Sequence, residues 1–399
     1  MWRQGPRHDE ARDTSPARSG TPAPTEVNGR TRFASVTLRD VAKRSGVSVT
    51  TASRILNGRE SGVPIREETR ARVHTAAADL GYKPNLLARG LRGSRSSLIG
   101  VIARDVSDPF HIQVLQGVNE VTRARDFRLF LGHVDYRPDV ALTYGSMFER
   151  SHADGILVLG DLADGDKAFS DLTVQHRFVV GVSDRTARGP FPGVYSDSVT
   201  GTALALEHLW SLGHRRIICV SDPGTEDQRL RALLYRRFMT DRGLGDAIVA
   251  YEVSQPDPGP SYQLGRRLFA AGVEGLAGGS GGAGGPGAND VGHTIPTAIY
   301  ATSDTIAIGL MQAAYQERVV VPDHVSIVGF DNLDIAAYTI PPLTTVSQAG
   351  VDLGRTAASL LLDMIETERS GDEVEDIVLQ PTLVIRESTA PPSSRATDG

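Results

Sequence analysis

The chain has 399 residues, room for one small and one larger domain, and 40% of them are hydrophobic, which allows a substantial core. Its net charge of −6, taken alone, argues against nucleic-acid binding. The single cysteine, Cys219, excludes an intrachain disulfide and a thiolate metal cluster, and no run reaches the roughly 18 to 20 apolar residues that span a bilayer.

Residues 1–35 are rich in Arg, Pro, Gly and Thr without apolar periodicity, so we expect a disordered N-terminal extension. They lack the apolar core of a secretory signal, which predicts a cytoplasmic protein. Residues 36–95 reverse the charge balance. They contain twelve Arg and Lys against five Asp and Glu, a surplus of seven, so the remainder carries −13. A basic segment on an acidic body is the electrostatic footprint of a nucleic-acid-binding module.

Residues 37–57 predict two short helices about a tight turn. The first helix has one apolar face, formed at positions i, i+3 and i+4 by Leu38, Val41 and Ala42. Thr37 offers a hydroxyl N-cap, and Asp40 follows three residues later, where a carboxylate can accept from free N–H groups. Gly46 allows the backbone to turn where a side chain is costly.

The second predicted helix is capped by Ser48 and presents two unlike faces. Its inner face is expected to contain Val47, Ala52, Ile55 and Leu56. Its outer face is expected to contain Val49, Thr50, Ser53, Arg54 and Asn57. Short hydrogen-bonding side chains beside one arginine suit base edges and phosphates in a major groove. The alternative for any helical hairpin is a solvated polar face without a partner.

Residues 67–80 predict a third helix that ends at Gly81, with inward positions Val73, Ala76, Ala77 and Leu80. Pro84 then precedes a short helix over about residues 85–92. This helix of about two turns is too short to be stable alone in water. Because Leu91 lies among arginines, the segment is typical of a hinge that folds only on DNA.

The order of these motifs resembles the LacI/GalR family of transcriptional regulators. The matching motifs are Thr-Leu-x-Asp-Val-Ala from Thr37, Gly-Val-Ser-x-x-Thr-x-Ser-Arg-x-Leu-Asn from Gly46, and Gly-Tyr-x-Pro-Asn-x-x-Ala-Arg-x-Leu from Gly81. The resemblance, which runs from about Val36 to Pro391, implies that the second helix enters the major groove. Base contacts are implied for Val49, Thr50 and Arg54, and phosphate contacts for Thr37, Ser48, Thr51, Ser53, Asn57 and Tyr82. Hinge contacts are implied for Asn85, Ala88 and Leu91, with the Leu91 pair of a dimer as a minor-groove wedge.

Beyond the hinge, strands and helices alternate in two sets. The predicted strands are 97–103, 127–131, 155–159, 178–182, 216–220, 247–253, 297–301 and 325–330. The predicted helices are 109–125, 140–149, 201–210, 230–242, 261–271 and 305–315. This alternation indicates an α/β domain over residues 96–390 with two lobes of parallel sheet covered by helices. Together with the resemblance, it predicts a small helix-turn-helix domain plus a periplasmic-binding-protein-like domain with a ligand cleft at the strand carboxyl ends.

The family topology implies three crossings between the lobes. The N-lobe is then expected at about 97–197 and 349–378, and the C-lobe at about 198–347 and 379–388. Glycine density predicts a flexible insertion at 275–292. No Lys-Ser or Lys-Thr follows it, so a phosphate-binding loop is disfavoured. Residues 391–399 are expected to be a disordered tail.

Three positions stand out as effector contacts. Asp304 follows an apolar strand, where it can cap the next helix and bind ligand hydroxyls or an amine. Arg229 matches the family's effector-binding arginine, and Phe110 an aromatic that flanks ligands; the alternatives are an exposed arginine and a core phenylalanine. Weaker candidates are His111, Asp135 and Arg185. The histidines lack metal-ligand spacing, and neither a metal nor a cofactor is expected.

The sequence therefore predicts a homodimeric DNA-binding regulator, expected to be a repressor of a pseudo-palindromic operator; a tetramer is the alternative assembly. The expected effector is a sugar, with a nucleobase or nucleoside as the alternative. Two other functions compete with this one. A solute-binding receptor is opposed by the basic module, and an enzyme by the absence of a nucleophile motif, a metal cluster and a dinucleotide fingerprint.

Overall fold

The computed structural model describes residues 36–56, 64–82, 95–160, 166–182, 190–253, 258–270 and 296–393. It divides into two compact units, residues 1–85 and 86–399. Several predictions fall outside the described residues, namely the hinge helix, the glycine-rich insertion, most of the tail, and the side chains of Asn57, Asn85, Ala88, Leu91 and Arg185.

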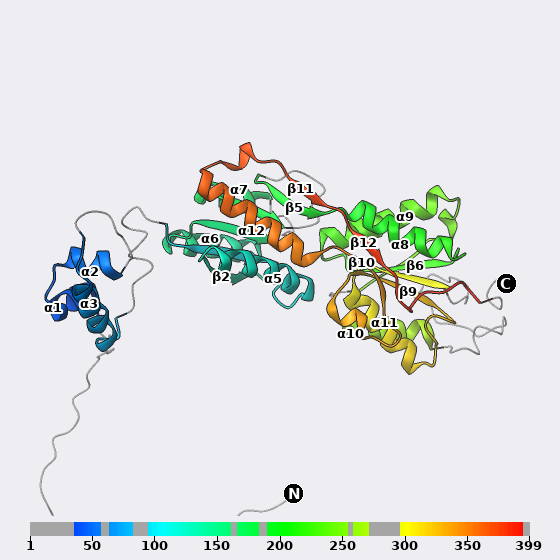
Figure 1. Ribbon diagram of the computed structural model, residues 1–399. Helices are drawn as coiled ribbons and strands as arrows, with labels where there is room; N and C mark the ends of the chain where they lie inside the picture. Colours follow the sequence, from blue (N-terminus) through cyan, green and yellow to red (C-terminus); the bar gives the residue numbers. More distant parts are fainter. Residues whose placement is uncertain are drawn as a thin grey trace, which may run out of the picture. The chain divides into compact units, whose positions relative to one another are not determined.

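The first unit contains three helices around one small core. They are α1 (Leu38–Ser45), α2 (Val49–Leu56) and α3 (Glu67–Asp79), drawn in blue in Figure 1. The core consists of Val41, Ala42, Ala52, Ile55, Val73, Ala76 and Ala77, with Val47, Leu56 and Leu80 packed against it. Gly46 adopts φ +68 at the turn after α1, which only glycine reaches without cost. The three predicted helices and their inward faces are confirmed.

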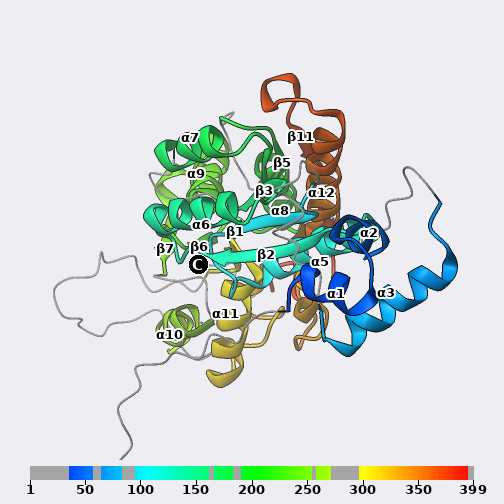
Figure 2. The ribbon, with the colours of Figure 1, turned by 90° about the vertical axis from the view of Figure 1, so that its left-hand side faces the viewer.

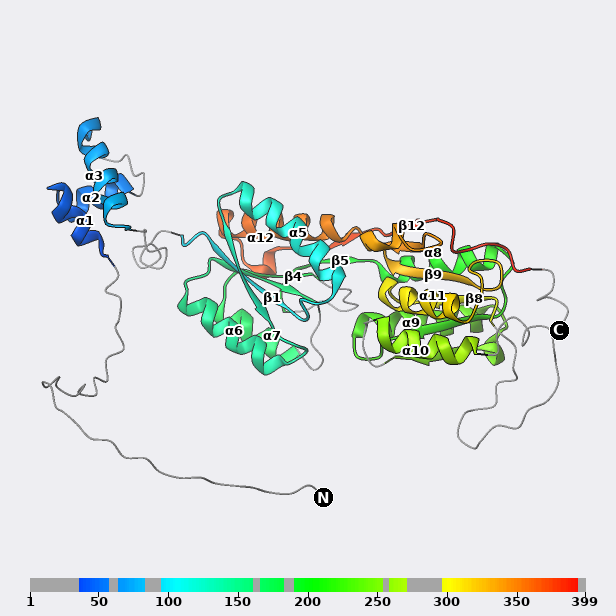
Figure 3. The same cartoon turned by 90° about the horizontal axis from the view of Figure 1, so that it is seen from below.

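The N-lobe of the second unit is a parallel sheet with strand order β11-β5-β4-β3-β1-β2. Its strands are β1 (Leu98–Ala103), β2 (Arg128–His133), β3 (Gly155–Leu159), β4 (Val179–Val182), β5 (Gly193–Ser196) and β11 (Ile377–Leu379). Its helices are α5 (Pro109–Ala124), α6 (Pro138–Arg150), α7 (Asp166–Gln175) and α12 (Gly350–Thr367). Figures 2 and 3 show α5 and α12 on one face of this sheet and α6 and α7 on the other.

The C-lobe has a second sheet with strand order β12-β10-β9-β8-β6-β7. Its strands are β6 (Ile217–Ser221), β7 (Val249–Glu252), β8 (Ala298–Ala301), β9 (Ser326–Asp331), β10 (Thr344–Ser347) and β12 (Thr382–Val384), and only the β10–β12 pair is antiparallel. Its helices are α8 (Ser198–Ser211), α9 (Glu226–Asp241), α10 (Pro258–Phe269) and α11 (Asp304–Gln316). One core lies under α10 and α11 and the other under α8 and α9.

These two helix-covered sheets confirm the predicted α/β architecture. Their central strands are buried along their whole length because both faces are covered. Cys219 in β6 is fully buried. Among the described residues, no helix combines the length and hydropathy required to cross a membrane.

Candidate functional site

The turn before α2 is organised by two hydroxyl groups. The Ser48 hydroxyl oxygen accepts from the Thr51 backbone N–H at 3.0 Å and lies 2.8 Å from the Thr51 hydroxyl. This is the predicted N-cap, and both side chains are at least partly exposed. Free N–H groups at a helix start favour an anion, so the position can receive a DNA phosphate.

The outward face of α2 is polar with one apolar member. Val49, which is 40% exposed, and Thr50 are open to solvent, while Ser53 and Arg54 are half-buried. The Thr37 hydroxyl and backbone N–H both donate to the Asp40 carboxylate, at 2.7 and 2.8 Å. These hydrogen bonds, with the side-chain one the larger cause, lower the pKa of Asp40. These hydrogen bonds fix the start of α1, and the inner face of α1 packs against α2.

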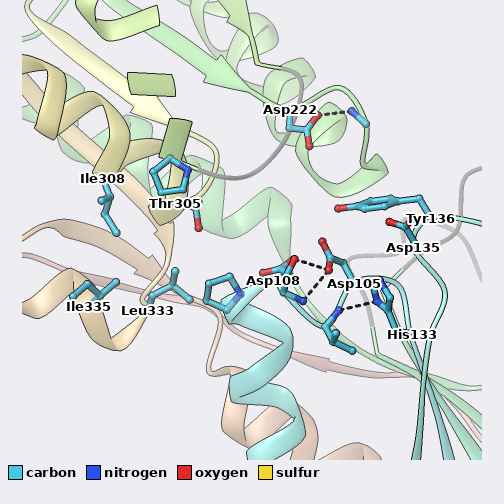
Figure 4. Close-up of a pocket in the computed structure, with 15 residues that line it drawn as sticks. Asp105, Asp108, His133, Asp135, Tyr136, Asp222, Thr305, Ile308, Leu333 and Ile335 are labelled. Atoms are coloured by element: carbon cyan, nitrogen blue, oxygen red, sulfur yellow. Dashed lines mark hydrogen bonds between the residues drawn. The ribbon is translucent and has the colours of Figure 1, made fainter. Parts of the chain in front are cut away.

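A pocket of about 830 Å³ opens between the two lobes of the second unit (Figure 4). Its N-lobe wall follows β1 and β2 and consists of Asp105, Val106, Ser107, Asp108, Pro109, His133, Asp135 and Tyr136. Its C-lobe wall consists of Asp222, Gly224, Pro258, Thr305, Ile308, Leu333 and Ile335. The pocket lies at the carboxyl ends of parallel strands, where open α/β sheets bind ligands, and its volume suits a small molecule.

A network of buried charges connects the lobes beside this pocket. Arg104, just after β1, lies 3.5 Å from Asp108 of its own lobe and 3.6 Å from Asp227 of the C-lobe. Arg231 of α9 lies 3.8 Å from Asp227 and 3.6 Å from Asp331. A smaller cavity of about 20 Å³ borders Asp108, Asp227, Arg231 and Asp331, and it shares Asp108 and Thr305 with the larger pocket. Lobe separation therefore breaks the Arg104–Asp227 ion pair at the site itself.

The pKa values of the two C-lobe carboxyls diverge. Burial is the largest single influence on the pKa of Asp227 and raises it. The charges of Arg104 and Arg231, together with local hydrogen bonds, outweigh burial and lower this pKa to about 2. Burial raises the pKa of Asp331 well above its usual value, although Arg231 opposes this. The Arg231 guanidinium also donates to the Ser198 hydroxyl and the Thr302 carbonyl, and its carbon lies 3.8 Å from the Phe330 ring centre. Arg231 is thus a rigid, desolvated cation at the inner end of the cleft.

Asp304 has a different setting from the one expected. Ser303, not Asp304, caps α11, because the Ser303 hydroxyl accepts from the Ile306 N–H. Asp304 is fully buried, accepts from the Leu333 N–H at 2.7 Å and from the Thr345 hydroxyl, and borders neither described pocket. In this structure the carboxyl joins α11 to the segments around β9 and β10.

We expect the Asp304 setting to make stability depend on pH. Burial raises the pKa of Asp304 to about 7, against 3.8 for an ordinary carboxyl. The folded state then holds a proton that the unfolded chain releases, so the free energy of unfolding falls as pH rises from about 4 to 7. Asp304→Asn keeps an acceptor for the Leu333 N–H but removes the titrating carboxyl. The free energy of unfolding of this variant, measured by urea unfolding at pH 5 to 8, should therefore fall less steeply with pH. Parallel pH curves for the variant and the wild type would contradict the assignment.

The remaining predicted effector residues lie at different depths. Asp135 borders the larger pocket and Phe110 the smaller one. His111 is 3% exposed, and its Nδ1 lies 2.7 Å from the Asp105 carbonyl oxygen, so it supports the loop that carries Asp105. Arg229 is exposed, and its side chain donates to the Pro223 carbonyl.

Sequence reasoning missed the charged residues that the structure places deepest in the site. Arg104, Arg231 and Asp331 were not selected, although Arg231 lies two positions from the selected Arg229 in the same motif. The residue directly after each apolar strand was the available signal for Arg104, and the last residue of β9 for Asp331. Both positions follow the rule that ligand contacts gather at strand carboxyl ends.

Comparisons with known proteins match this arrangement. Residues 37–85 match the family described as bacterial regulatory proteins, lacI family. Residues 96–238 match the periplasmic binding proteins and sugar binding domain of LacI family, and residues 206–389 a periplasmic binding protein-like domain. The HTH-type transcriptional regulator DegA of Bacillus subtilis is 30% identical over 366 residues, which cover 89% of this chain and 98% of DegA. The chain belongs to the LacI family.

Solved structures agree with this membership. The Lac repressor dimer bound to operator and the anti-inducer ONPF aligns with a TM-score of 0.72 and 25% identity, over 89% of this chain and 99% of that chain. A LacI family regulator from Enterococcus faecium with bound ribose aligns with a TM-score of 0.61 and 25% identity, over 74% of this chain and 99% of that chain. This LacI family member is therefore a DNA-binding transcriptional regulator and not an enzyme, and the solute-receptor alternative is excluded.

Proposed function

We propose that this regulator is a homodimeric repressor that binds a pseudo-palindromic operator and is controlled by a small effector in the inter-lobe pocket. The observation that carries the proposal is the pocket itself, because Arg104 and Asp227 join opposite lobes at its inner end. A ligand there has different contacts in open and closed lobes, and only such differential affinity shifts a conformational equilibrium. Since its target is DNA, we place the protein in the cytoplasm.

For the DNA contacts, we propose that Val49, Thr50 and Arg54 reach base edges while Ser48 and Thr51 hold phosphates. The exposure of Val49 and Thr50 and the capped start of α2 support these roles. The Lac repressor structure with operator supports DNA as the partner. Phosphate contacts by Thr37, Ser53, Asn57 and Tyr82, and hinge contacts by Asn85, Ala88 and Leu91, are proposed from the sequence motifs.

For the effector, we propose a carbohydrate or carbohydrate-like molecule. The Enterococcus faecium relative with bound ribose supports this class. The pocket supplies hydrogen-bond acceptors on its N-lobe wall and an apolar patch on its C-lobe wall, formed by Ile308, Leu333 and Ile335. A sugar ring has both polar edges and an apolar face, which such walls complement. Among the effector contacts predicted from the sequence, Asp135 is the one that borders this pocket. Four others remain candidates from the sequence: Phe110, Arg229, Asp304 and Arg185.

For the assembly, we propose a dimer in which exposed apolar side chains of the C-lobe pack together. Tyr338 is 79% exposed and Ile340 is 94% exposed, and both lie in the segment between the η3 turn (Asp334–Ala337) and β10. Large apolar side chains concentrated at a surface are typical of interfaces. The Lac repressor dimer supports two copies. A dimer also positions two α2 helices for two half-sites of one operator.

The proposal is tested by selecting operators from genomic fragments and measuring binding by fluorescence anisotropy. Specific affinity should fall roughly 10³- to 10⁵-fold between 50 and 200 mM salt if six to ten phosphates are contacted. Thr50→Ala should weaken specific binding by about 1 to 3 kcal/mol and leave binding to random DNA nearly unchanged. His74→Ala, an exposed change on α3, is the control. Absence of a preferred site, or indifference to salt, would contradict the proposed function.

A further inference from the structure

We propose that the effector carries a positive charge, as a protonated amine on a polar scaffold, held by the carboxylates of the N-lobe wall and Asp222. This inference rests on the proposed function, since it specifies the ligand class of the same pocket. It goes beyond a neutral sugar or nucleoside. Four carboxyl groups border the larger pocket, and its described lining contains neither lysine nor arginine: Asp105, Asp108, Asp135 and Asp222 are the acidic members.

Three of these carboxyls form no ion pair with any described residue, namely those of Asp105, Asp135 and Asp222. Among the nearby cations, Arg104 pairs with Asp108 and Asp227, and Arg231 pairs with Asp227 and Asp331. The charge of Arg229 acts on Asp222 together with that of Arg104, but the Arg229 side chain donates to the Pro223 carbonyl and forms no ion pair with Asp222 among the described residues. Asp105 and Asp222 accept only local hydrogen bonds, from Ser107 and from the Gly224 N–H, and the described residues give their second oxygens no donor. Carboxylates that have no counter-charge and one oxygen without a donor are costly in a partly enclosed pocket until a cation or donor arrives.

A second observation at the same wall points to a missing polar partner. The Tyr136 hydroxyl is buried and has no hydrogen-bond partner among the described residues. In Figure 4 it points into the pocket between Asp105 and Asp222. A buried hydroxyl normally finds a partner, so its orientation fits a ligand group between these carboxyls. An ammonium has three donors and can serve two carboxylates and the phenol oxygen together.

The geometry favours an organic cation over a metal ion. Within the described residues, no group of three or more His, Cys, Asp or Glu side chains is placed to hold a metal. The neighbouring His133 uses its Nδ1 to accept from the Val106 N–H, so this nitrogen is not free to bind a metal ion. The apolar patch of Ile308, Leu333 and Ile335 and the volume of about 830 Å³ leave room for a ring attached to the amine. The fitting class is therefore an amine-bearing sugar, polyol or nucleoside.

The positive charge of the effector is tested with two series of ligands. Within each series the members share one scaffold and differ only in the group at one carbon. The first is 6-amino-6-deoxyglucose, glucose and glucuronate, and the second is 5′-amino-5′-deoxyadenosine, adenosine and adenosine 5′-carboxylate. Binding to the full chain is measured by calorimetry. The amine member of at least one series should bind roughly tenfold or more tightly than its hydroxyl and carboxylate analogues, the scale of a charge-assisted hydrogen bond. An equal or tighter hydroxyl or carboxylate member, or no binding by either amine, overturns the proposal.

Asp135→Asn and its matched control locate the effect. Asp135 adopts φ +49, a region that asparagine tolerates, so the variant should fold normally. It should reduce the preference for the amine roughly tenfold. Asp139→Asn removes an exposed carboxylate that pairs with Arg137 outside the pocket and should leave the preference unchanged. Operator binding is measured on the same samples, because its loss would refute the proposed function, whereas a neutral effector with intact operator binding would refute only the charge.

Discussion

Gly117→Ala should lower the free energy of unfolding by about 2 to 3 kcal/mol, because α5 and α12 meet backbone to backbone at this residue. A Cβ built on Gly117 lies 1.9 Å from the Val351 carbonyl oxygen, and one on Gly354 lies 2.0 Å from the Val114 carbonyl oxygen. Neither contact is to a flexible side chain, so the helices must separate. Alanine has the better helix propensity by about 1 kcal/mol, and a net loss therefore isolates the clash.

Urea unfolding monitored by circular dichroism measures this effect. Gly245→Ala is the matched control, since a Cβ there meets only the Thr240 hydroxyl at 3.9 Å. The control should change stability by less than about 0.5 kcal/mol, as surface changes do. If Gly117→Ala were equally neutral, α5 and α12 could not approach as closely as the structure has them.

Arg231→Ala should cost about 3 to 5 kcal/mol at pH 8, the range for removing one partner of a buried ion pair. The change leaves Asp227 and Asp331 without their shared cation and removes the hydrogen bonds to the Ser198 hydroxyl and the Thr302 carbonyl. Without that cation the pKa values of both carboxyls rise. At pH 5 the carboxyls then protonate more readily, so the stability loss should be smaller than at pH 8.

Arg229→Ala supplies the comparison two residues away on the same helix. Arg229 is exposed and its side chain donates to the Pro223 carbonyl, so its removal should cost less than about 1 kcal/mol at either pH. The pair also separates two assignments of the effector arginine. If Arg229→Ala removed the effector response and a folded Arg231 variant kept it, the sequence-based candidate would be right and the buried network would be purely structural.

The helix-turn-helix unit was predictable because its information is local. Ser48, Gly46 and the apolar spacing act within one or two turns, and the structure confirms each of them. The long apolar strands were predictable for the same reason. The helices α7 and α12 and the strands β5, β10, β11 and β12 were missed. These strands have only three or four residues, and such short elements depend on the sheet that they join.

For the site, the sheet edge at which it lies was predictable, but the side chains that line it were not. Residues two apart on a helix point about 200° apart, so the motif that contains Arg229 and Arg231 does not tell which one faces the cleft. Asp304 shows the same limit. A carboxylate after a strand can turn to a ligand or to the protein, and here Leu333 and Thr345, distant in sequence, take both oxygens.

The single thiol of the chain has a practical consequence for following the lobes in solution. Cys219 lies in the middle of β6 with no exposed surface, and burial raises its pKa, so the reactive thiolate is scarce. A cysteine introduced on the surface of each lobe, for example at Asp139 and at Arg237, is therefore labelled by a maleimide dye in the otherwise native sequence. Energy transfer between two such dyes then reports the opening of the lobes as effector or operator is added.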